Sequence, residues 1–560
     1  PASGVAMAAI FAYATLTREG SPVWRAALMF AAYLAARLLY RERAALNTIG
    51  MAALILLTSH PRALFAASFQ MSFLCVGLLA GIGVPVLQRT LGPFERGLRN
   101  LDALACDRSV PPAVAQFRLD LRLIIRRLSL LLPGRVSGWL LVGGLRVLFG
   151  FSELVVLSAV MQIGMALPMA YYFHRATSVA LVANLLAVPL LQLLMPAAVL
   201  AICVSYVSPG LAKVPAAIAN FALDNIAGSV RWLGGMRIAD IRLPAPSLAM
   251  VLFAGAAIAT CIFCIRRRAW IAVGGAGCLL ASTVLLWTVP PPEHFRSGAL
   301  EMTAIDVGQG DSILLVLPDG NKLLVDAGGL PFWMHSQMDI GEDVVSAYLW
   351  ARGFSRIDAI ALTHAHGDHM GGFPAVIANF HPRELWLPEN VVEEEARPLL
   401  AVAARYGVRL IYRGAGETFP YGGARIRILA PDPQFPIRSG HRNDESLVMQ
   451  VEHGDTSVLL EADAEKGTER LVASHHPRAD VLKVAHHGSA SATNTDLLEA
   501  VRPRYAVISA GTRNVYRHPR PEVLQRLQDA GALTYRTDLD GATTFYLDGK
   551  RVTVENFRPH

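Results

Sequence analysis

Three histidines and one aspartate fall within six consecutive positions in the second half of the chain, at His364, His366, Asp368 and His369. An apolar run at 357–362 precedes them and predicts a buried strand. Imidazole nitrogen and carboxylate oxygen are the ligands that zinc-like divalent ions bind in proteins. A packing role does not explain so many ligands at the end of one strand, so the segment predicts a pair of divalent metal ions.

Two later segments carry side chains of the same kinds after other expected strands. Asp463 follows the apolar run at 457–460, and His486 and His487 follow the run at 480–484. Functional side chains commonly lie on loops that a rigid sheet holds in place. We therefore expect three distant segments of the chain to meet at one metal site.

The surrounding sequence alternates between β-rich runs and helical patterns, which define the elements that position these segments. Strands are expected at 302–307, 312–318, 322–327, 357–362, 384–387, 425–429, 446–452, 456–460, 480–485 and 505–509. Helices are expected at 341–352, after Met370, at 465–474 and at 494–500. Two β-rich halves with helices outside them predict an α/β fold, a four-layer αββα sandwich.

The chain has 560 residues, which is too long for a single hydrophobic core. Residues 1–292 carry 24 Lys and Arg against 9 Asp and Glu, whereas residues 293–560 carry 27 against 35. Fourteen of the 16 histidines follow residue 292, and all 6 cysteines precede it. We therefore expect a polytopic α-helical membrane domain at 1–290 and the sandwich at 293–560. Because the chain opens without Met or a signal peptide, we also expect its natural N-terminus to be missing.

Apolar windows long enough to span a bilayer recur through the first domain. They lie at 4–17, 24–40, 44–59, 63–87, 152–173, 176–206, 246–265 and 269–289, which predicts seven to nine spans. Gln70, Asn184 and Gln192 lie within these windows, where a polar side chain in contact with lipid would be costly. They are candidates for an aqueous channel, although hydrogen bonding between helices explains each one equally well.

The segment 88–146 differs from these windows because it is basic and amphipathic. Arg118, Arg122 and Arg126 recur every four residues among leucines. Such a pattern is typical of a helix that lies on a membrane surface. Contact with a polyanion is the alternative interpretation of the same stripe.

Three arginines at 266–268 separate the last two apolar windows and predict the side of the membrane on which the second domain lies. Loops rich in Lys and Arg stay in the cytoplasm. One further crossing at 269–289 then delivers residues 293–560 to the outer side. We therefore expect the metal-binding domain to be extracytoplasmic.

Seven motifs in a fixed order carry a family resemblance. They are IDVGQGDS (305–312), LLVDAGG (323–329), THAHGDHMGG (363–372), NDESLV (443–448), LLEAD (459–463), LKVAHHGS (482–489) and NVYRHP (514–519). The HAHGDH cluster, the later aspartate and HHGS resemble the metallo-β-lactamase superfamily of hydrolases, and the full order resembles the ComEC family of bacterial competence proteins. The membrane half is similar to that family in SPVWRAALM (21–29), ASFQMSF (67–73) and VANLLAVPLLQ (182–192). The family's first spans and an OB-like domain have no counterpart in the chain.

This resemblance implies a protein of the bacterial cytoplasmic (inner) membrane that takes up DNA during natural transformation. A channel would carry single-stranded DNA inward from a double-stranded donor, and the hydrolase domain would degrade the other strand as a phosphodiesterase or nuclease. The implied partners are DNA, the lipid bilayer and other proteins of the competence machinery.

The resemblance also implies a ligand set for two divalent metal ions, zinc or manganese. The set consists of His364 and His366 for the first ion, Asp368, His369 and His487 for the second, and Asp463 between them. Two such ions activate water and stabilise the attacking and leaving oxygens of a phosphodiester.

The chain departs from the superfamily at the first of these ions. Most members supply a third histidine ahead of the bridging aspartate, whereas this chain has Asn443 and Asp444 there, as ComEC relatives do. His441 lies two residues earlier and is a candidate substitute, and without it the first ion is weakly held. His487 is the favoured ligand of its pair because the superfamily ligand usually stands directly before glycine. His486 is then left to contact the substrate or to orient other groups.

Three further aspartates are assigned supporting roles. Asp326 stands at a strand end and is expected to orient a metal ligand. Asp306 and Asp311 flank a tight turn at 308–310, and a structural role is favoured over a direct one for both.

The motif at 514–519 has the composition of a loop on the substrate side. Asn514, Tyr516 and His518 supply polar and aromatic groups, and arginines at 513, 517 and 520 could contact phosphates. A solvated surface loop is the alternative.

Two alternatives to DNA uptake remain open. The excess of 35 acidic over 27 basic residues in the second domain is unfavourable for binding a polyanion, unless metal ions and local arginines dominate. One alternative is therefore a membrane-tethered metallo-phosphoesterase that acts on phosphodiesters of the cell envelope. The other is a transport protein with an inactive hydrolase domain, which the absent third histidine would allow.

Overall fold

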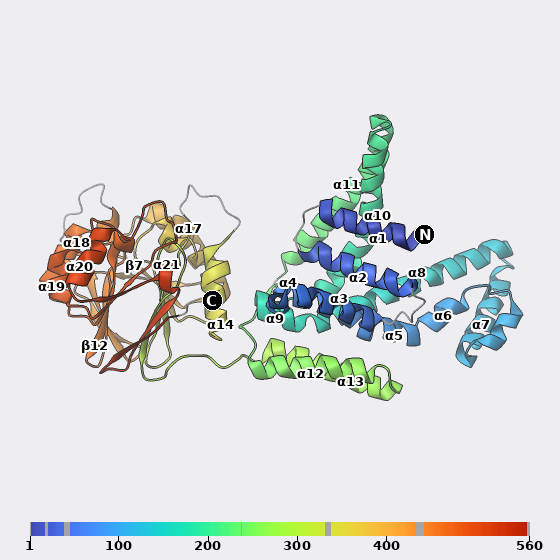
Figure 1. Cartoon of the computed structure of the whole chain (residues 1–560), viewed down its shortest axis with the longest axis horizontal. Helices are drawn as coiled ribbons and strands as arrows, with labels where there is room; N and C mark the ends of the chain where they lie inside the picture. Colours follow the sequence, from blue (N-terminus) through green and yellow to red (C-terminus); the bar gives the residue numbers. More distant parts are fainter. Residues whose placement is uncertain are drawn as a thin grey trace. The chain divides into compact units, whose positions relative to one another are not determined.

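The computed structural model describes residues 2–16, 21–38, 45–236, 238–330, 338–432 and 442–556. Within it the chain forms two compact units, Pro1–Pro290 and Pro291–His560. The first unit is helical, and the second is built on two large β-sheets (Figure 1). The fold class predicted from the sequence, a helical membrane domain followed by an α/β sandwich, is confirmed.

Apolar helices dominate the first unit, because a helix satisfies all its interior backbone groups without water. In chain order they are α1 (Ala2–Leu16), α2 (Ser21–Leu38), α3 (Ala45–Ser59), η1 (Pro61–Phe65), α4 (Ala67–Leu78), η2 (Leu79–Gly83), α5 (Val84–Arg89), α6 (Gly92–Gly97), η3 (Leu104–Ser109), α7 (Pro112–Leu128), α8 (Gly134–Gly164), α9 (Ala166–Phe173), α10 (Ala180–Ser205), α11 (Pro209–Gly234), α12 (Leu248–Cys264) and α13 (Ala269–Thr288). Two short strands, β1 (Arg175–Ala176) and β2 (Ile241–Arg242), pair antiparallel.

Four helical stretches among the described residues are long and apolar enough to cross a membrane, as expected of a membrane protein. They are the continuous stretch Ala67–Arg89, which combines α4, η2 and α5, together with α8, α10 and α13. Shorter apolar helices accompany them at Gly4–Leu16, Val23–Ala35, Leu46–Ser59 and Leu248–Cys264. The number of seven to nine spans stays a prediction.

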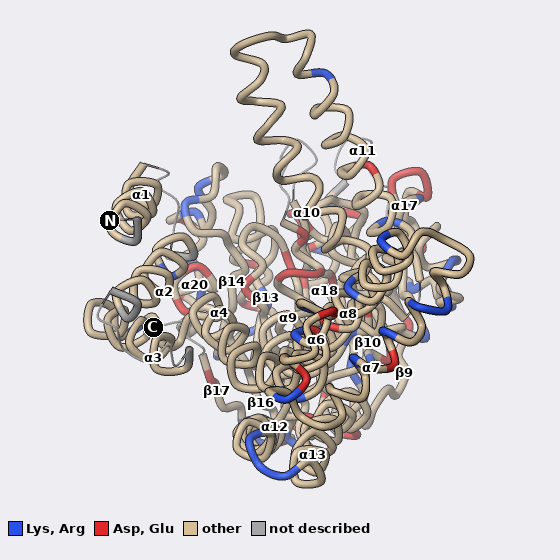
Figure 2. Tube along the Cα trace, turned by 90° about the vertical axis from the view of Figure 1, so that its right-hand side faces the viewer, with Lys and Arg blue, Asp and Glu red and all other residues tan. Residues whose placement is uncertain are grey.

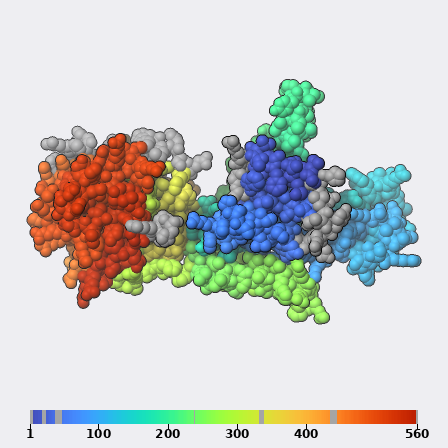
Figure 3. Space-filling model, in the orientation of Figure 1, coloured from blue at the N-terminus to red at the C-terminus, as the bar shows by residue number. Residues whose placement is uncertain are grey.

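Helices α10 and α11 form a hairpin whose distal end stands clear of the other helices of the first unit (Figure 3). Its tip exposes Tyr206 and Val207, which are 88% and 86% accessible. Apolar side chains at such exposure are suited to contact with lipid rather than water.

Helix α8 begins earlier than the sequence indicated. Its 31 residues start at Gly134, whereas the apolar window was expected at 152–173 and the basic segment was expected to continue to 146. Arg135 and Arg146 are the basic residues within this longer helix. These two charges and the acidic Glu153 are isolated, and they do not interrupt a helix whose other residues are mainly leucine, valine and glycine, because helix formation is cooperative along the run.

The predicted amphipathic helix is α7, and one residue of its basic stripe is buried. Arg118 is 1% exposed, and its guanidinium donates hydrogen bonds to the backbone carbonyls of Gly97 and Asn100 at 2.6 and 2.8 Å. It also pairs with Asp107 at 2.6 Å, and Arg122 contacts the same carboxylate. Arg118 therefore fastens the segment that precedes α7 onto the helix.

Strands of the second unit follow short β-rich runs separated by Gly and Asp turns. They are β3 (Leu300–Ala304), β4 (Ile313–Val316), β5 (Lys322–Val325), β6 (Ala359–Ala361), β7 (Glu384–Pro388), β8 (Arg409–Arg413), β9 (Thr418–Tyr421), β10 (Ala424–Ala430), β11 (Val448–His453), β12 (Thr456–Leu460), β13 (Val481–Lys483), β14 (Tyr505–Ile508), β15 (Leu533–Arg536), β16 (Thr543–Leu547) and β17 (Val552–Asn556). The helices are η4 (Gly341–Ser346), α14 (Ala347–Ala351), α15 (Gly367–Met370), α16 (Phe373–Phe380), α17 (Glu393–Tyr406), η5 (Arg442–Glu445), α18 (Lys466–Ser474), η6 (Ala485–Gly488), α19 (Thr495–Val501), α20 (Pro521–Asp529) and α21 (Thr537–Asp540).

These elements form four layers. One sheet has the strand order β17-β16-β3-β4-β5-β6-β7-β8 and the other has the order β15-β14-β13-β12-β11-β10-β9. A central core, which includes Met302 and Met449, fills the space between the sheets. Two outer cores join each sheet to its own helices, one around Phe373 and Leu324, the other around Leu482. Alternate residues of each strand thus face different cores, which fixes the register.

The metal-ligand segments lie where parallel strands of the two sheets end. Strands β5, β6, β7 and β8 are parallel in the first sheet, and β12, β13, β14 and β15 are parallel in the second. Loops after the carboxyl ends of parallel strands meet at one edge, which is where ligand sites form in such folds.

Candidate metal centre

The loop that carries the first cluster follows β6 and rests on glycines from two other loops. Gly310 and Gly329 have φ angles of +141° and +153°. A Cβ atom at Gly310 would lie 2.4 Å from the carbonyl oxygen of Asp368, and one at Gly329 would lie 2.0 Å from that of Gly367. Only glycine lets the backbone approach so closely. The glycines of IDVGQGDS and LLVDAGG therefore seat the loop that presents Asp368.

A buried carboxylate holds the ring of His369. Asp326 Oδ2 accepts a hydrogen bond from His369 Nδ1 at 2.7 Å, and the two oxygens of Asp326 accept further bonds from the Thr363 amide and hydroxyl at 2.9 and 2.6 Å. A carboxylate bound to one ring nitrogen fixes the tautomer and the direction of the other. His369 Nε2 is thereby directed toward Asp463.

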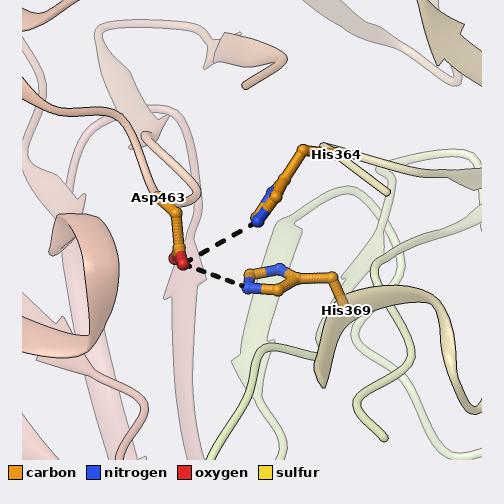
Figure 4. Close-up of side chains that lie close together, drawn as sticks. All are labelled: His364, His369 and Asp463. Atoms are coloured by element: carbon orange, nitrogen blue, oxygen red, sulfur yellow. Dashed lines mark ion pairs between the residues drawn. The ribbon is translucent and has the colours of Figure 1, made fainter. Parts of the chain in front are cut away.

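Histidines after β6 and the aspartate after β12 converge across the two halves of the sandwich (Figure 4). Asp463 Oδ2 lies 3.4 Å from His369 Nε2 and 3.8 Å from His364 Nε2. His366 Nδ1 lies 2.9 Å from His364 Nε2. The four side chains that HAHGDH and LLEAD supply here therefore direct donor atoms at one small volume.

His487 completes the cluster from the end of β13. Its Nε2 lies 3.7 Å from Asp368 Oδ2 and 3.7 Å from Asp463 Oδ1, and its Nδ1 donates a hydrogen bond to the Ser509 carbonyl at 3.1 Å. Asp311 Oδ1 lies 3.5 Å from the same Nδ1. His487 is 2% exposed, so its free nitrogen has no access to bulk water.

The neighbouring His486 is placed differently, on the wall of the centre. Its Nε2 lies 3.9 Å from Asp463 Oδ2, and its Nδ1 lies 3.4 Å from Glu465 Oε1. Asn443 Nδ2 donates to the same Glu465 oxygen at 3.1 Å and lies 3.4 Å from His486 Nδ1. Asn443 therefore occupies a polar network beside the cluster.

Asp444 lies outside this network. Its Oδ1 accepts hydrogen bonds from the backbone amides of Glu465 and Thr468 at 3.3 and 3.1 Å, at the start of α18. A carboxylate in this position satisfies amides that a helix leaves unpaired in its first turn. The structure thus does not bring Asp444 to the metal ligands, and His441 lies outside the described residues.

Electrostatics set the protonation of the buried groups. Burial by itself lowers the pKa of an imidazole, but at His369 and His487 the charge of Asp463 outweighs this effect. The pKa of His369 is therefore well above its ordinary value, and the pKa of His487 is raised to about 10. Burial would raise the pKa of Asp463, but the charges of His487 and His369 hold it well below its ordinary range. Protonated imidazoles therefore provide positive charge where a bound cation would supply it.

The donor atoms fit a divalent metal ion. His369 Nε2, His487 Nε2 and Asp463 Oδ1 are buried and make no hydrogen bond among the described residues. Leaving such atoms unpaired is costly, so each is expected to have a ligand. Four groups among the described residues meet the spacing of metal ligands. Two contain only predicted ligands, namely His364, His369 and Asp463, and Asp368, His369 and His487. The other two include Asp311, once with Asp326 and His369 and once with Asp463 and His487.

A pocket of about 280 Å³ opens over Asp463 and His487. It is lined by Gln309, His366, Gly367, Asp368, Asn443, Asp463, His486, His487, Tyr516 and His518. The loop that contributes the last two residues is shaped by Asn514, whose Oδ1 accepts from the His518 amide at 2.9 Å. Asp306, by contrast, accepts a hydrogen bond from the Gly308 amide at 3.2 Å and shapes the turn near the pocket.

The channel candidates of the membrane unit lie in two different settings. Gln70, on α4, accepts a hydrogen bond from the Tyr172 hydroxyl at 2.8 Å and donates to the Leu64 carbonyl at 2.9 Å, so it links α4 to α9. Asn184 and Gln192 lie two turns apart on α10, where Gln192 is exposed. Their role in a channel stays a prediction.

Lys483 is a residue of the centre that sequence reasoning missed. It is 1% exposed on β13, and its Nζ donates to Asp311 Oδ2 at 2.6 Å and to the Val484 carbonyl at 3.0 Å. The available signal was a lysine within the apolar run of LKVA, since a charge in a buried strand requires a partner. The pair joins the loop before β4 to β13 beneath His487.

Fold and site together define a metallo-β-lactamase-superfamily domain, and residues 305–512 match the model of that superfamily. Residues 2–268 match the model described as competence protein. The chain belongs to the family that joins these two domains, the ComEC family of competence proteins.

Curated relatives resemble the chain over one or both domains. It is 26% identical to ComE operon protein 3 of Bacillus subtilis over 98% of the chain and 64% of that protein. It is 28% identical to Recombination protein 2 of Haemophilus influenzae over 50% of the chain and 32% of that protein. Competence protein ComA of Neisseria gonorrhoeae is 30% identical over 48% of the chain and 35% of that protein. The chain thus spans less than two thirds of the length of these relatives.

Proposed function

We propose that the chain belongs to a DNA-uptake apparatus of the bacterial cytoplasmic membrane, with a metal-dependent phosphodiesterase as its second unit. The observation that carries the hydrolase assignment is the convergence of buried ligand atoms of His369, His487 and Asp463 that make no hydrogen bond among the described residues, with the last two residues lining an open pocket. The competence-protein match of the membrane unit and the names of two of the relatives, ComE operon protein 3 and Competence protein ComA, support the assignment to DNA uptake.

The residues of the metal centre have different roles in this proposal. His364, His366, Asp368, His369, Asp463 and His487 would hold two divalent ions, zinc or manganese. Ions bound in such a centre lower the pKa of water and stabilise negative charge on phosphate oxygens. Asp326 keeps Nε2 of His369 directed at the centre through its bond to Nδ1. His486 and Asn443, on the pocket wall, are placed to meet the substrate.

A contact within the membrane unit supports the predicted orientation. The Arg89 guanidinium at the end of α5 donates to the carbonyls of Ile265, Arg266 and Arg267 at 2.6 to 2.7 Å. It thus connects the start of the basic 88–146 segment to the arginine-rich turn between α12 and α13. Figure 2 shows this turn in blue, between the labels α12 and α13. Basic residues gathered at one end of the helical bundle favour the cytoplasmic side of the membrane for that end. Helix α13 would then deliver the hydrolase unit to the extracytoplasmic side.

In this proposal the membrane unit carries a single strand of DNA inward while the hydrolase unit degrades the strand that stays outside. Gln70, Asn184 and Gln192 are the proposed polar residues of the channel. Double-stranded donor DNA, the lipid bilayer and other competence proteins would be its partners.

The charge of the hydrolase unit favours a second candidate. With 35 acidic against 27 basic residues after position 292, the unit repels a polyanion at long range. A phosphoesterase that cleaves small phosphodiesters of the cell envelope would not suffer from this repulsion.

One assay separates the two candidates. The full chain in lipid nanodiscs is supplied with zinc or manganese and offered single-stranded DNA, double-stranded DNA and bis(4-nitrophenyl) phosphate. Cleavage of DNA that is lost in Asp463→Asn and His369→Gln, but kept in the exposed control Asp455→Asn, supports the nuclease. Cleavage of the small ester without cleavage of either DNA would reject the nuclease in favour of the envelope phosphoesterase.

A fusion experiment tests the proposed orientation. Alkaline phosphatase fused after residue 293 should be active in intact cells, and the same enzyme fused after residue 267 should be inactive.

A further inference from the structure

The loop 511–520, here termed the rim loop, is held at both ends by segments of the metal centre. The Gly511 amide donates to Gln309 Oε1 at 3.2 Å, and the Arg520 amide donates to the Gly488 carbonyl at 2.9 Å. Inside the loop, Asn514 bonds to both backbone groups of His518, accepting from its amide and donating to its carbonyl at 2.6 Å. The rim loop is therefore a defined structure beside the pocket.

Two arginines of the rim loop are exposed and held in an unusual backbone conformation. Arg513 and Arg517 both have φ of 57°, in the left-handed region, which costs a non-glycine residue about 1 kcal/mol or more. Neither forms an ion pair among the described residues. Burial first, and then the nearby His486, lower the pKa of His518 to about 4, so arginines and not this histidine supply positive charge here.

Between the two arginines the rim loop presents aromatic surface toward the pocket. Tyr516 is 42% exposed and lines the pocket together with His518, whose ring lies 5.7 Å from the tyrosine ring at 30°. Val515 beside it is 71% exposed. An aromatic ring next to free guanidinium groups is the combination that binds a nucleic-acid strand, through base stacking and phosphate contacts.

We propose that the rim loop binds a single strand of nucleic acid, with Tyr516 stacked on an unpaired base and Arg513 and Arg517 on the flanking phosphates. The proposal rests on the proposed function of the same site and names the form of its substrate. A pocket of about 280 Å³ has room for little more than one nucleotide, so a longer strand must continue across the rim. In a duplex both faces of each base are stacked, so Tyr516 would favour a single strand.

The local charge also answers the electrostatic objection to a nuclease. The unit as a whole is acidic, but screening limits its repulsion to about 8–10 Å at physiological salt. Arg517 stands between the pocket-lining residues Tyr516 and His518, and Arg513 is three residues before Tyr516, so both would act within that distance of a strand bound on the rim loop. Each phosphate contact on a single strand contributes about 0.7 to the slope of affinity against salt, so the two arginines together should contribute about 1.4.

The test is photo-cross-linking of the full chain in nanodiscs to a 15-residue oligothymidylate that carries one 5-iododeoxyuridine. Because stacking brings the iodinated base against an aromatic ring, mass spectrometry should place the adduct on Tyr516. The adduct should be lost in Tyr516→Ala, kept in Tyr516→Phe, and reduced at least fivefold in Arg513→Gln/Arg517→Gln. Arg397→Gln/Arg425→Gln removes the same charge from exposed sites elsewhere on the unit and should behave as wild type. A duplex of the same length should compete at least tenfold less well.

Cross-linking in the presence of a chelator does not depend on cleavage, so it separates this proposal from the proposed function. Adducts on Tyr516 without any metal-dependent cleavage would overturn the hydrolase and keep the rim loop as a strand-binding element. In the metal-loaded protein, Arg513→Gln/Arg517→Gln should lower kcat/KM for the oligonucleotide about tenfold and leave bis(4-nitrophenyl) phosphate hydrolysis unchanged.

Three results would overturn the proposal. The first is an adduct outside the rim loop, or an adduct on Tyr516 whose yield the arginine substitutions do not reduce. The second is an equal loss of oligonucleotide and small-ester hydrolysis, since the loop would then only support the centre. The third is labelling of the rim loop by a photoactivatable anionic phospholipid in the nanodisc, which would assign the arginines to lipid phosphates.

Discussion

Lys483→Met tests whether the buried ion pair beneath the metal centre holds the two halves of the sandwich together. The pair joins Nζ of Lys483 on β13 to Oδ2 of Asp311 before β4, at 2.6 Å. Both side chains are buried, at 1% and 3% exposure. Methionine has a similar volume and keeps the packing, so the substitution removes mainly the charge and its hydrogen bonds.

The expected cost follows from what the substitution leaves behind. Removing one partner of a buried pair costs about 3–5 kcal/mol, because the remaining charge stays desolvated. His487 Nδ1 lies 3.5 Å from Asp311 Oδ1 and compensates in part, which favours the lower limit of about 3 kcal/mol. For a unit of this size each kcal/mol shifts Tm by about 2–4 °C, so the transition should fall by roughly 6–12 °C.

The assay is differential scanning calorimetry of the full chain in detergent. The transition of the hydrolase unit is identified as the one that added zinc raises, since a ligand of the folded state stabilises it. The double variant Asp311→Asn/Lys483→Met carries no unpaired charge and should recover at least half of the loss. Lys466→Met, at an exposed lysine of α18, should shift the transition by less than 2 °C.

The reasoning would be refuted by either of two results. If Lys483→Met unfolds within 2 °C of wild type, the pair does not carry a buried charge across the sandwich. If the single and double variants unfold at the same temperature, the cost lies in lost packing and not in the uncompensated carboxylate of Asp311.

Four further outcomes follow from other contacts of the structure. Zinc binding at pH 7.5 should release about two protons, because the raised pKa values of His369 and His487 keep both rings protonated in the metal-free protein. Titration calorimetry in buffers of different ionisation enthalpy will count the released protons. The raised pKa values also stabilise the folded, metal-free unit. This stabilisation is complete below the unfolded histidine pKa of about 6.5 and is lost as pH rises toward 10, the pKa of His487. The Tm of the unit should therefore fall between pH 7 and pH 10, and a flat profile would contradict this. Asp444→Ala removes the acceptor at the start of α18 and should cost about 1 kcal/mol in thermal unfolding without changing zinc stoichiometry. Arg118→Met leaves buried carbonyls in the 97–101 segment without a donor and should make that segment sensitive to limited proteolysis, whereas unchanged cleavage would assign the arginine to the surface.

Much of the architecture could be predicted because its signals are local. Apolar windows without charge predict membrane helices, and alternating β-rich runs between Gly and Asp turns predict the strands of the sandwich. The boundary of α8 was missed since Arg135 and Arg146 lowered the local hydropathy without breaking the helix. Strands β16 and β17 near the C-terminus were also missed, because they are short and join the sheet only through tertiary pairing, β16 with β3 and β17 with β16.

The candidate metal ligands show the same division between local and tertiary information. Sequence by itself determined that His364, His366, Asp368 and His369 share one loop after a strand, since six residues cannot separate far. It also determined that Asp463 and two later histidines stand at strand ends. It did not determine which of these atoms face one another.

Only the tertiary structure decided those relations, because the atoms come from three separate segments, with 94 positions from His369 to Asp463 and 24 from Asp463 to His487. It directs His487 into the cluster and leaves His486 on the pocket wall, and it uses Asp444 to cap α18. It also pairs Lys483 with Asp311 across the sandwich. A one-dimensional pattern specifies which donors are available, but the low dielectric interior that makes their pairing energetically important exists only after the two sheets have packed.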